Sequence, residues 1–410
     1  MPTSVTSPVA LLLMVLSGGV ACGEDRSTEA EEARIEPLPA WVTEAEYRFG
    51  DSPEEEVFFA SPMVRADPAR GRIFAVDPRN HQVSAWTPDG TLLFRVGQKG
   101  EGPGEFIDMG SLHIETDGAF RVQEARRGRY TRYTAHGELV GTTPGPPATL
   151  SYQGRSVDLH WPDEGSYLGD LAIAVGSTPT GEALVPDPRT PVLRVRDLGD
   201  GRWSDPEPLL WLEIGNLTHV ISIPDGMPTD RFVTSQPFGD PDHVRFEPGA
   251  AVVMRPKGDP GTVELIEVDA TGDTVWHRRV ELAPRRLTSD MVDGVAETWL
   301  AQRASRDMPP ARLRQAYYDG LYQPEYVPPA EAPPVLTASG EVWIRTPEVL
   351  DNLRVYYAVP RGEPAGLLRR VLLPESLWLT DATETHIWGA QWDSIGRPHV
   401  IGRRLVAPVG

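Results

Sequence analysis

The chain has 410 residues, with 39 Lys and Arg against 59 Asp and Glu, so its formal net charge is −20 at pH 7. Such a charge repels phosphate backbones and argues against nucleic acid as a partner. Hydrophobic residues make up 40% of the chain, and Gly and Pro number 39 and 41. This composition is unlike that of a chain disordered throughout, a helical bundle or a coiled coil.

Residues 1–22 have the pattern of a lipoprotein-type signal peptide. The apolar run Val9–Leu16 is too short to span a bilayer and is typical of a signal-peptide core. Small residues follow at 17–21, and then comes Cys22, the one cysteine of the chain. This segment resembles the lipobox of bacterial lipoproteins, in which the cysteine thiol receives a diacylglycerol, so Cys22 is the predicted lipidation site. The alternative is an ordinary secretory signal with an incidental Cys22.

Residues 23–45 are predicted to be an acidic, flexible tether. Gly23–Glu36 contains six acidic and two basic residues, too polar a stretch to bury a core. By resemblance to lipoprotein sorting in Gram-negative cells, Gly23 directly after Cys22 favours the outer membrane. We therefore expect a cell-envelope lipoprotein, on the periplasmic or the surface side, with the membrane as its partner through the N-terminal lipid anchor.

Residues 46–410 consist of short β-type runs separated by Gly, Pro and Asp. The clearest unit contains Gly71–Asp77, Gln82–Trp86 and Thr91–Val96, and its second copy contains Gly118–Gln123 and Arg129–Tyr133. The offset from Gly71 to Gly118 equals that from Gly90 to Gly137, at 47 positions. Two landmarks at one offset indicate a repeat.

Weaker copies can be traced from Gly181, Gly249, Gly340 and Thr385, which makes six candidate units. A period of about 40–50 residues built from short strands is typical of β-propeller blades. The predicted fold class is therefore all-β, a six-bladed β-propeller over 46–410. The run Glu46–Phe49 is expected to complete the last blade and so close the ring.

A helical insertion is predicted at about 287–320, between late blades. Thr288 or Ser289 suits a helix N-cap, and Val292, Val295, Ala296 and Trp299 fall on one helical face. Pro310 suits the first turn of a second helix. After the Pro-rich stretch Pro324–Pro334, the sequence again has the pattern of strands. The insertion either packs against the blades or forms a lid over the channel.

The run Gly97–Phe106 is rich in glycine but lacks the Gly-Lys-Ser/Thr ending of a phosphate loop and leads into no helix. It resembles the inter-blade linker of NHL-repeat-type propellers, and Asp77–Asn80 with Val83 resembles the Asp…Asn-x-x-Val signature of that family. The resemblance implies a six-bladed propeller in which Phe106 anchors the linker between sheets. Similar bacterial lipoproteins are mostly uncharacterised, so the resemblance implies a fold and a location more than an activity.

No serine-hydrolase elbow, zinc-protease pair or calcium-binding loop occurs, and the nine histidines are scattered. Some NHL-type propellers are metal-dependent lyases whose channel histidines come from different blades. That resemblance makes His113, His386 and His399 candidate ligands and gives the alternative function, a metal-dependent lyase or hydrolase with its site in the central channel. Asp240–His243 is interpreted as a turn between strands.

The tryptophans offer either stacking surfaces for sugars or packing between blades; those considered are Trp161, Trp299, Trp343, Trp388 and Trp392. The sequence assigns no catalytic, cofactor or metal-binding residue and identifies no cofactor. We therefore favour a non-enzymatic binding or scaffolding module, expected to be a monomer. Its protein or carbohydrate ligand would lie on one propeller face or at the channel mouth.

Overall fold

The computed structural model describes most of the residues in the unit from Leu38 to the C-terminal region. The described residues are 38, 40–49, 59–124, 128–145, 149–152, 155–160, 167–168, 171–177, 189–199, 202–213, 218–222, 231–247, 250–256, 258–303, 310–361 and 369–408. Cys22, the signal peptide and residues 23–37 of the tether lie outside them. None of the helices described is long and apolar enough to cross a membrane.

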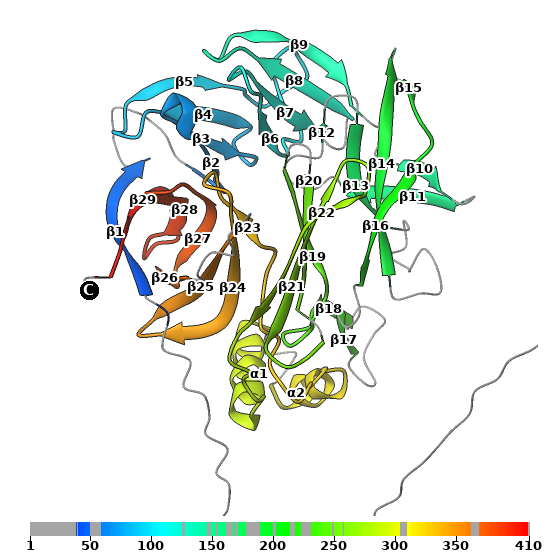
Figure 1. Cartoon of the computed structure of the whole chain (residues 1–410), viewed down its shortest axis with the longest axis vertical. Helices are drawn as coiled ribbons and strands as arrows, with labels where there is room; N and C mark the ends of the chain where they lie inside the picture. The colour runs from blue at the N-terminus through cyan, green and yellow to red at the C-terminus, as the bar shows by residue number, and fades with distance from the viewer. Residues whose placement is uncertain are drawn as a thin grey trace, which may run out of the picture. The chain divides into compact units, whose positions relative to one another are not determined.

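Antiparallel sheets dominate the unit (Figure 1). The first sheet contains β2 (Met63–Asp67), β3 (Arg72–Asp77), β4 (Gln82–Trp86) and β5 (Leu92–Val96), with the 3-10 turn η1 (Pro68–Arg70) after β2. The second contains β6 (Leu112–Ile114), β7 (Phe120–Glu124), β8 (Arg129–Tyr133) and β9 (Leu139–Pro144). The third contains β10 (Thr149–Tyr152), β11 (Arg155–His160), β12 (Tyr167–Leu168), β13 (Leu171–Ser177), β14 (Arg189–Gly199), β15 (Arg202–Trp203) and β16 (Glu207–Glu213).

A hairpin of β17 (Thr218–Ser222) and β18 (Arg231–Ser235) follows. The fourth sheet contains β19 (His243–Glu247), β20 (Ala250–Arg255), β21 (Thr262–Asp269) and β22 (Thr274–Glu281), and the helices α1 (Ser289–Arg303) and α2 (Pro310–Asp319) come next. The fifth sheet contains β23 (Val335–Leu336), β24 (Glu341–Leu350), β25 (Leu353–Pro360) and β26 (Arg369–Pro374). The sixth contains β27 (Leu377–Ala382), β28 (His386–Trp392), β29 (Pro398–Val406) and, from the other end of the chain, β1 (Ala40–Phe49).

The first, second and fourth sheets are four-stranded meanders in chain order, the arrangement expected of a propeller blade. The predicted runs Gln82–Trp86 and Arg129–Tyr133 coincide with β4 and β8, and the runs from Gly249 and Gly340 lead into β20 and β24. The run at Gly181 lies outside the described residues, and the later run of the same copy, Val192–Arg196, lies within β14. The mostly-β prediction and the helical insertion are confirmed, whereas the number of blades stays a prediction.

The strand β1 joins the two ends of the chain. It pairs antiparallel with β29 from Val42 opposite Val406 to Phe49 opposite Val400, as the sequence predicts for residues 46–49. It begins earlier than expected, because residues 40–45, assigned to the tether, already form strand. Backbone pairing accounts for the earlier start, since Ala40 and Trp41 pair with β26 and Val42–Ala45 with β29. The Trp41 ring also lies 4.5 Å from the guanidinium carbon of Arg369. A short parallel pairing of β1 with β26 also connects the fifth and sixth sheets.

The glycine-rich linker is folded by backbone hydrogen bonds and by Phe106, as predicted. The Phe106 ring is fully buried among apolar side chains of the first and second sheets. The backbone N–H of Phe106 donates to the Gln98 carbonyl at 2.8 Å. Gly97 has φ +90°, and a Cβ there would lie 2.6 Å from the His81 carbonyl oxygen, so only glycine fits this crossover.

Five apolar clusters show which sheets pack together. They connect the second sheet to the first, the first to the sixth, the sixth to the fifth, the fifth to the fourth and the fourth to the third; representative pairs are Phe120 with Phe74, Trp86 with Trp388, Leu379 with Trp343, Ile344 with Met254, and Phe246 with Leu212. No such cluster joins the second and third sheets within the described residues. The described sheets pack in the order second, first, sixth, fifth, fourth and third, and closure of this series into a ring stays a prediction.

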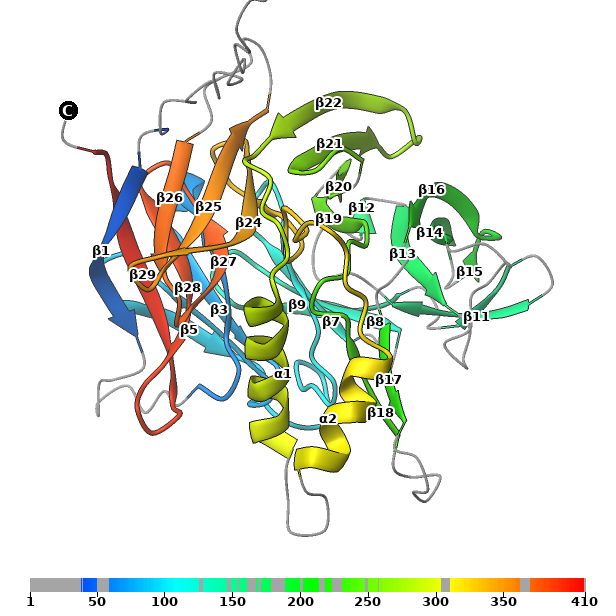
Figure 2. The same cartoon turned by 90° about the horizontal axis from the view of Figure 1, so that it is seen from below.

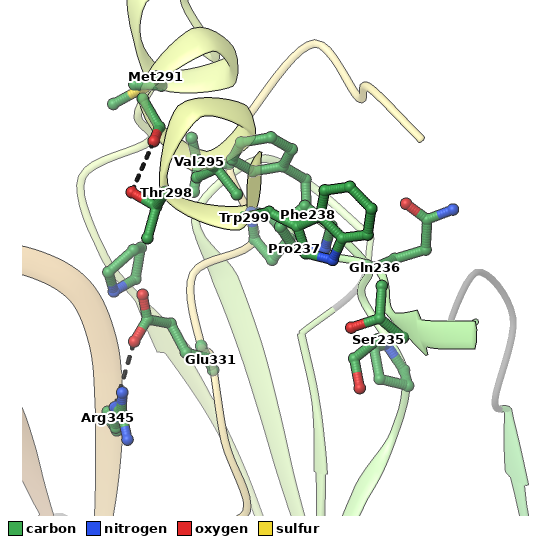
Figure 3. Close-up of a pocket in the computed structure, with 18 of the residues that line it drawn as sticks. Ser235, Gln236, Pro237, Phe238, Met291, Val295, Thr298, Trp299, Glu331 and Arg345 are labelled. Atoms are coloured by element: carbon green, nitrogen blue, oxygen red, sulfur yellow. Dashed lines mark hydrogen bonds and ion pairs between the residues drawn. The ribbon is translucent and has the colours of Figure 1, made fainter. Parts of the chain in front are cut away.

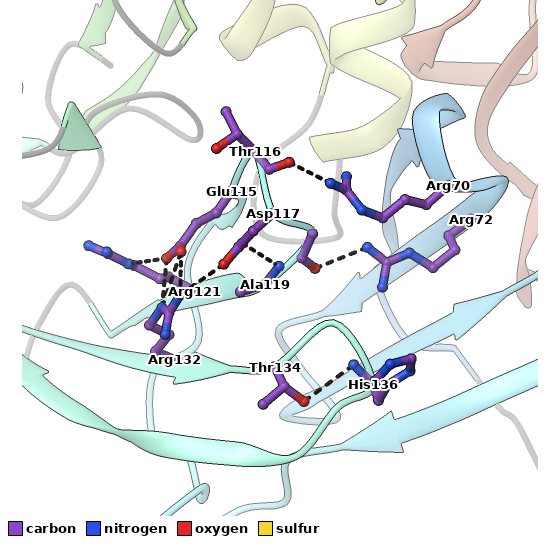
Figure 4. Close-up of polar contacts among 11 residues, drawn as sticks. Arg70, Arg72, Glu115, Thr116, Asp117, Ala119, Arg121, Arg132, Thr134 and His136 are labelled. Atoms are coloured by element: carbon purple, nitrogen blue, oxygen red, sulfur yellow. Dashed lines mark hydrogen bonds and ion pairs between the residues drawn. The ribbon is translucent and has the colours of Figure 1, made fainter.

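Polar contacts reinforce the packing of the first sheet on the second (Figure 4). Arg72 is buried, donates to Asp67 Oδ2 at 2.6 Å, and also donates to the carbonyl oxygens of Gly118 at 3.0 Å and Ala135. In the second sheet, Glu115 accepts hydrogen bonds from Arg132 and Arg121. Both bonds lower the pKa of its carboxyl group, that from Arg132 more strongly. Arg72 therefore connects the first sheet to turns of the second, whereas the Glu115 contacts lie within the second sheet.

Candidate functional site

The helical insertion forms as the sequence predicts. Thr288 precedes α1, and its hydroxyl oxygen accepts a hydrogen bond from the Met291 N–H at 3.4 Å, which caps the helix. Val292, Ala296 and Trp299 lie on the buried face, and α2 begins at Pro310. Both views place the two helices beside the β17–β18 hairpin rather than within a sheet (Figure 2).

An apolar cluster holds the helices on the hairpin. Ile221 of β17 packs with Trp299 of α1 and Tyr317 of α2. His219 of β17 is fully buried, and its ring meets the Tyr317 ring edge-on with centroids 4.8 Å apart. Burial lowers the pKa of His219, so its imidazole is neutral at pH 7. The insertion is therefore a packed part of the unit with its own core.

The helix α1 has a second face that lines a pocket. Met291, Gly294, Val295, Thr298 and Gln302 recur at the three- and four-residue spacing of one helical face, and all five border the cavity. This face lies next to the one that packs on α2 and the hairpin. One helix thus connects the core of the insertion to an open site.

The chain between β18 and β19 provides the second wall. Pro237, Phe238 and Pro241 border the cavity, and proline restricts the backbone here. The Gln236 side chain fixes this wall to the end of α2, because its Nε2 donates to the Gly320 carbonyl at 2.8 Å and its Oε1 accepts from the Tyr322 N–H at 3.0 Å. His243 also lines the pocket, and burial lowers its pKa to about 4, which leaves it uncharged at pH 7.

Charged groups lie on the third wall. Arg345 of β24 donates to Glu331 with its Nε 3.2 Å from Oε2, and Arg285 donates to the Pro347 carbonyl at 3.4 Å. Figure 3 shows Trp299, Phe238 and Pro237 together on one side of the pocket and Glu331 with Arg345 on another. The cavity has a volume of about 830 Å³, within the ~300–1,000 Å³ that is common for small-molecule sites.

The candidate histidines of the metal hypothesis do not meet. In the sixth sheet His386 lies opposite Arg404, and His399 lies opposite Gln391. The two therefore stand five residues apart along β29, or about 17 Å at ~3.3 Å per residue. His386 instead contacts Glu46, and His399 contacts Asp393, at 3.0 and 3.3 Å. The predicted convergence of His386 and His399 is wrong, because the register of β28 and β29 holds them five positions apart.

His113 and the Asp240–His243 segment also have structural settings. His113 lies on β6 opposite Arg121, and burial lowers its pKa. Asp242 is buried and accepts from the Glu213 N–H at 2.9 Å and from Arg255 Nε at 3.1 Å. It thereby ties β16 to the start of β19, which agrees with the interpretation of a turn. Among the residues that the structure places, no three His, Cys, Asp or Glu side chains lie together so that they could hold a metal ion.

The predicted tryptophans divide between packing and exposure. Trp343 and Trp388 are buried between sheets, and Trp299 borders the pocket. Trp392 is 38% exposed and stacks on Trp378 with ring centroids 6.0 Å apart. Trp161 lies outside the described residues. Of this set, Trp299 is the member that contributes to a cavity.

No protein-family model matches the chain, and no curated protein matches it. Among solved structures, a member of the duf4221 family from Bacteroides vulgatus matches with 8% identity and a TM-score of 0.45, over 90% of this chain and 98% of that one. Virginiamycin B lyase from Staphylococcus aureus, solved with quinupristin, matches with 12% identity and a TM-score of 0.36, over 84% and 95%. Regucalcin, a calcium-binding protein from Agrobacterium tumefaciens, matches with 10% identity and a TM-score of 0.36, over 90% and 96%.

The lyase and regucalcin have β-propeller folds. At identities of 8–12% and TM-scores below 0.5, these matches assign neither a blade number nor an activity to this chain.

Sequence reasoning identified the insertion but missed the walls that face it. Phe238, Arg285 and Arg345 come from three separate segments, and nothing in their spacing connects them. The available signal was the proline content on both sides of the insertion, in the 237–241 stretch and in Pro324–Pro334. Proline restricts the backbone, so proline-rich connections on both sides of an inserted helix indicate fixed walls beside that helix.

Proposed function

We propose that this protein is an envelope-anchored binding module that holds a small, mainly apolar ligand in the pocket beside α1. One observation carries the proposal: a cavity of about 830 Å³ is lined by Trp299, Phe238 and Val295, with a few polar groups at its border. Such a lining is typical of ligand sites. Proline-containing walls and a helix fixed by its own core keep the site formed without ligand, which lowers the entropic cost of binding.

We further propose that the six sheets form a six-bladed β-propeller and that Cys22 anchors it to a membrane through a lipid. The packing order of the sheets supports the first part, and the signal-peptide pattern supports the second. In cells fed a labelled fatty acid, we expect the wild-type protein to be labelled and Cys22→Ala to be unlabelled. Equal labelling of the two would exclude Cys22 as the lipidation site.

The pocket can be tested by filling it. Gly294 lines the cavity from α1, and a Cβ added there meets no atom within 4 Å. We expect Gly294→Leu to weaken binding of the neutral fluorophore N-phenyl-1-naphthylamine at least tenfold, or ~1.4 kcal/mol. The same change replaces glycine inside a helix and so should stabilise α1 by about 0.5–1 kcal/mol. Fluorescence titration and thermal unfolding of each variant measure the two effects.

Ala301→Leu is the matched control for this change. Ala301 lies on α1, is exposed and does not border the pocket. It should leave binding of the fluorophore unchanged, although the same side chain is added to the same helix. If Gly294→Leu binds N-phenyl-1-naphthylamine as tightly as Ala301→Leu does, the pocket is not the binding site.

A further inference from the structure

We propose that the ligand of this pocket carries one anionic group on its apolar body, and that Arg285 binds that group. This inference rests on the proposed function of the pocket. The ligand class is an amphipathic anion of the carboxylate or sulfonate type, with an apolar part that lies against Trp299 and Phe238.

The charges on the pocket wall differ in sign from those of the whole chain. Among its lining residues, Arg285 and Arg345 are cationic, Glu331 is anionic and His243 is neutral at pH 7, so the wall carries one net positive charge. The chain as a whole carries −20. A positive group at the border of an apolar cavity, within an otherwise acidic protein, attracts an anion to that place.

The two arginines are not equivalent. Arg345 is ion-paired with Glu331, which also accepts from Arg354 at 2.8 Å. Arg285 is exposed and, within the described residues, makes one long hydrogen bond to the Pro347 carbonyl and no ion pair. A guanidinium group has five N–H donors and matches a carboxylate through two parallel hydrogen bonds. Arg285 therefore has donors left for a ligand.

The backbone holds Arg285 in place at the pocket. Its carbonyl accepts from the Val327 N–H at 2.8 Å, and the Leu287 N–H donates to the Glu325 carbonyl at 3.0 Å, so the segment is paired as a short bridge. Neighbouring side chains on extended backbone point to opposite sides. Accordingly Arg286 does not line the cavity, and it pairs with Glu325 at 2.8 Å instead.

Trp299 lies at the apolar end of the site. Its indole N–H is buried and has no hydrogen-bond acceptor among the described residues. The Arg303 guanidinium carbon lies 5.0 Å from the centre of the Trp299 ring, which adds positive potential on this side.

Two fluorophores that share one frame test the inference. 8-Anilino-1-naphthalenesulfonate and N-phenyl-1-naphthylamine differ in the sulfonate group alone. We expect the wild-type protein to bind the sulfonate about tenfold more tightly than the neutral compound at low ionic strength, and Arg285→Gln to abolish that preference without weakening the neutral compound. Arg286→Gln is the matched control, because it removes the adjacent cation outside the pocket and should retain the full preference.

The outcomes separate this inference from the proposed function. If wild-type protein binds both compounds equally, or if Arg285→Gln retains the preference for the sulfonate, the assignment of an anionic ligand to Arg285 is wrong while the pocket remains a binding site. If neither compound binds, the proposed function itself fails. Equal losses in Arg285→Gln and Arg286→Gln would show a general charge effect and would also overturn the inference.

Discussion

Phe49→Ala should lower the free energy of unfolding by about 3–5 kcal/mol, the usual cost of removing a fully buried phenylalanine. Phe49 is 3% exposed at the end of β1, where its ring lies 5.4 Å from that of Trp86 and 6.2 Å from that of Trp388. These rings belong to the first and sixth sheets. The substitution therefore opens a cavity at the contact that joins the two ends of the chain, and urea or thermal unfolding measures the loss.

Val42→Ala is the control for Phe49→Ala. Val42 is on the same strand and pairs with the same partner strand, but it is 40% exposed. Its truncation should change the free energy of unfolding by no more than ~0.5 kcal/mol, as expected for a surface position. Similar losses in the two variants would show that β1 contributes general strand pairing and no specific apolar contact between the sheets.

Asp67→Ala should lower the free energy of unfolding by a similar amount, because it removes one partner of a buried ion pair. Asp67 and Arg72 are 5% and 6% exposed, and the substitution leaves the Arg72 guanidinium buried without its counter-ion. Breaking a buried pair in this way costs about 3–5 kcal/mol. Because Arg72 also donates to carbonyl oxygens of the second sheet, we expect the packing of the first two sheets to weaken as well. Chemical denaturation of the purified variant gives the loss directly.

The double variant Asp67→Leu with Arg72→Met tests the cause of that loss. Replacing both charges by apolar groups removes the buried Arg72 cation that lacks a counter-ion, so the double variant should be more stable than Asp67→Ala. Asp259→Ala, which removes the partner of Arg279 in an exposed ion pair, should have little effect. A double variant less stable than Asp67→Ala would mean that the hydrogen bonds of Arg72, rather than its charge, dominate.

The strands could be predicted because each carries its own local signal. Thr87 and Gly90 illustrate this: the Gly90 N–H donates to the Thr87 carbonyl at 3.0 Å, and Gly90 has φ +94°. Thr134 and Gly137 form the same turn, with φ +84° at the glycine. The turn chemistry recurs in the sequence at the same offset, so a repeat of hairpins follows from it directly.

The start of β1 and the positions of the candidate histidines could not be predicted from local sequence signals. Trp41 joins the strand by pairing with Val371, more than 300 positions along the chain, and its ring lies next to the Arg369 guanidinium. His386 and His399 are separated because register along β28 and β29 places them at different heights. Both facts depend on which strands become neighbours, and no local pattern encodes that choice.

The pocket required the same long-range information. The helix is local, and the sequence predicts one packed face from the spacing of Val292, Val295, Ala296 and Trp299. The face that lines the pocket, to which Val295 contributes, was not predicted. The opposing wall comes from segments near 236–243, 285 and 345, which meet because the fourth and fifth sheets pack together. The polar part of the site is therefore a product of packing order.

A crystal structure of the protein grown with N-phenyl-1-naphthylamine would show whether the pocket beside α1 is the binding site. We predict one molecule of the compound in the cavity beside α1, with its rings against Trp299 and Phe238, and none there in Gly294→Leu. Density for the compound at other places only, with the cavity beside α1 free of it in the wild-type protein, would contradict the account.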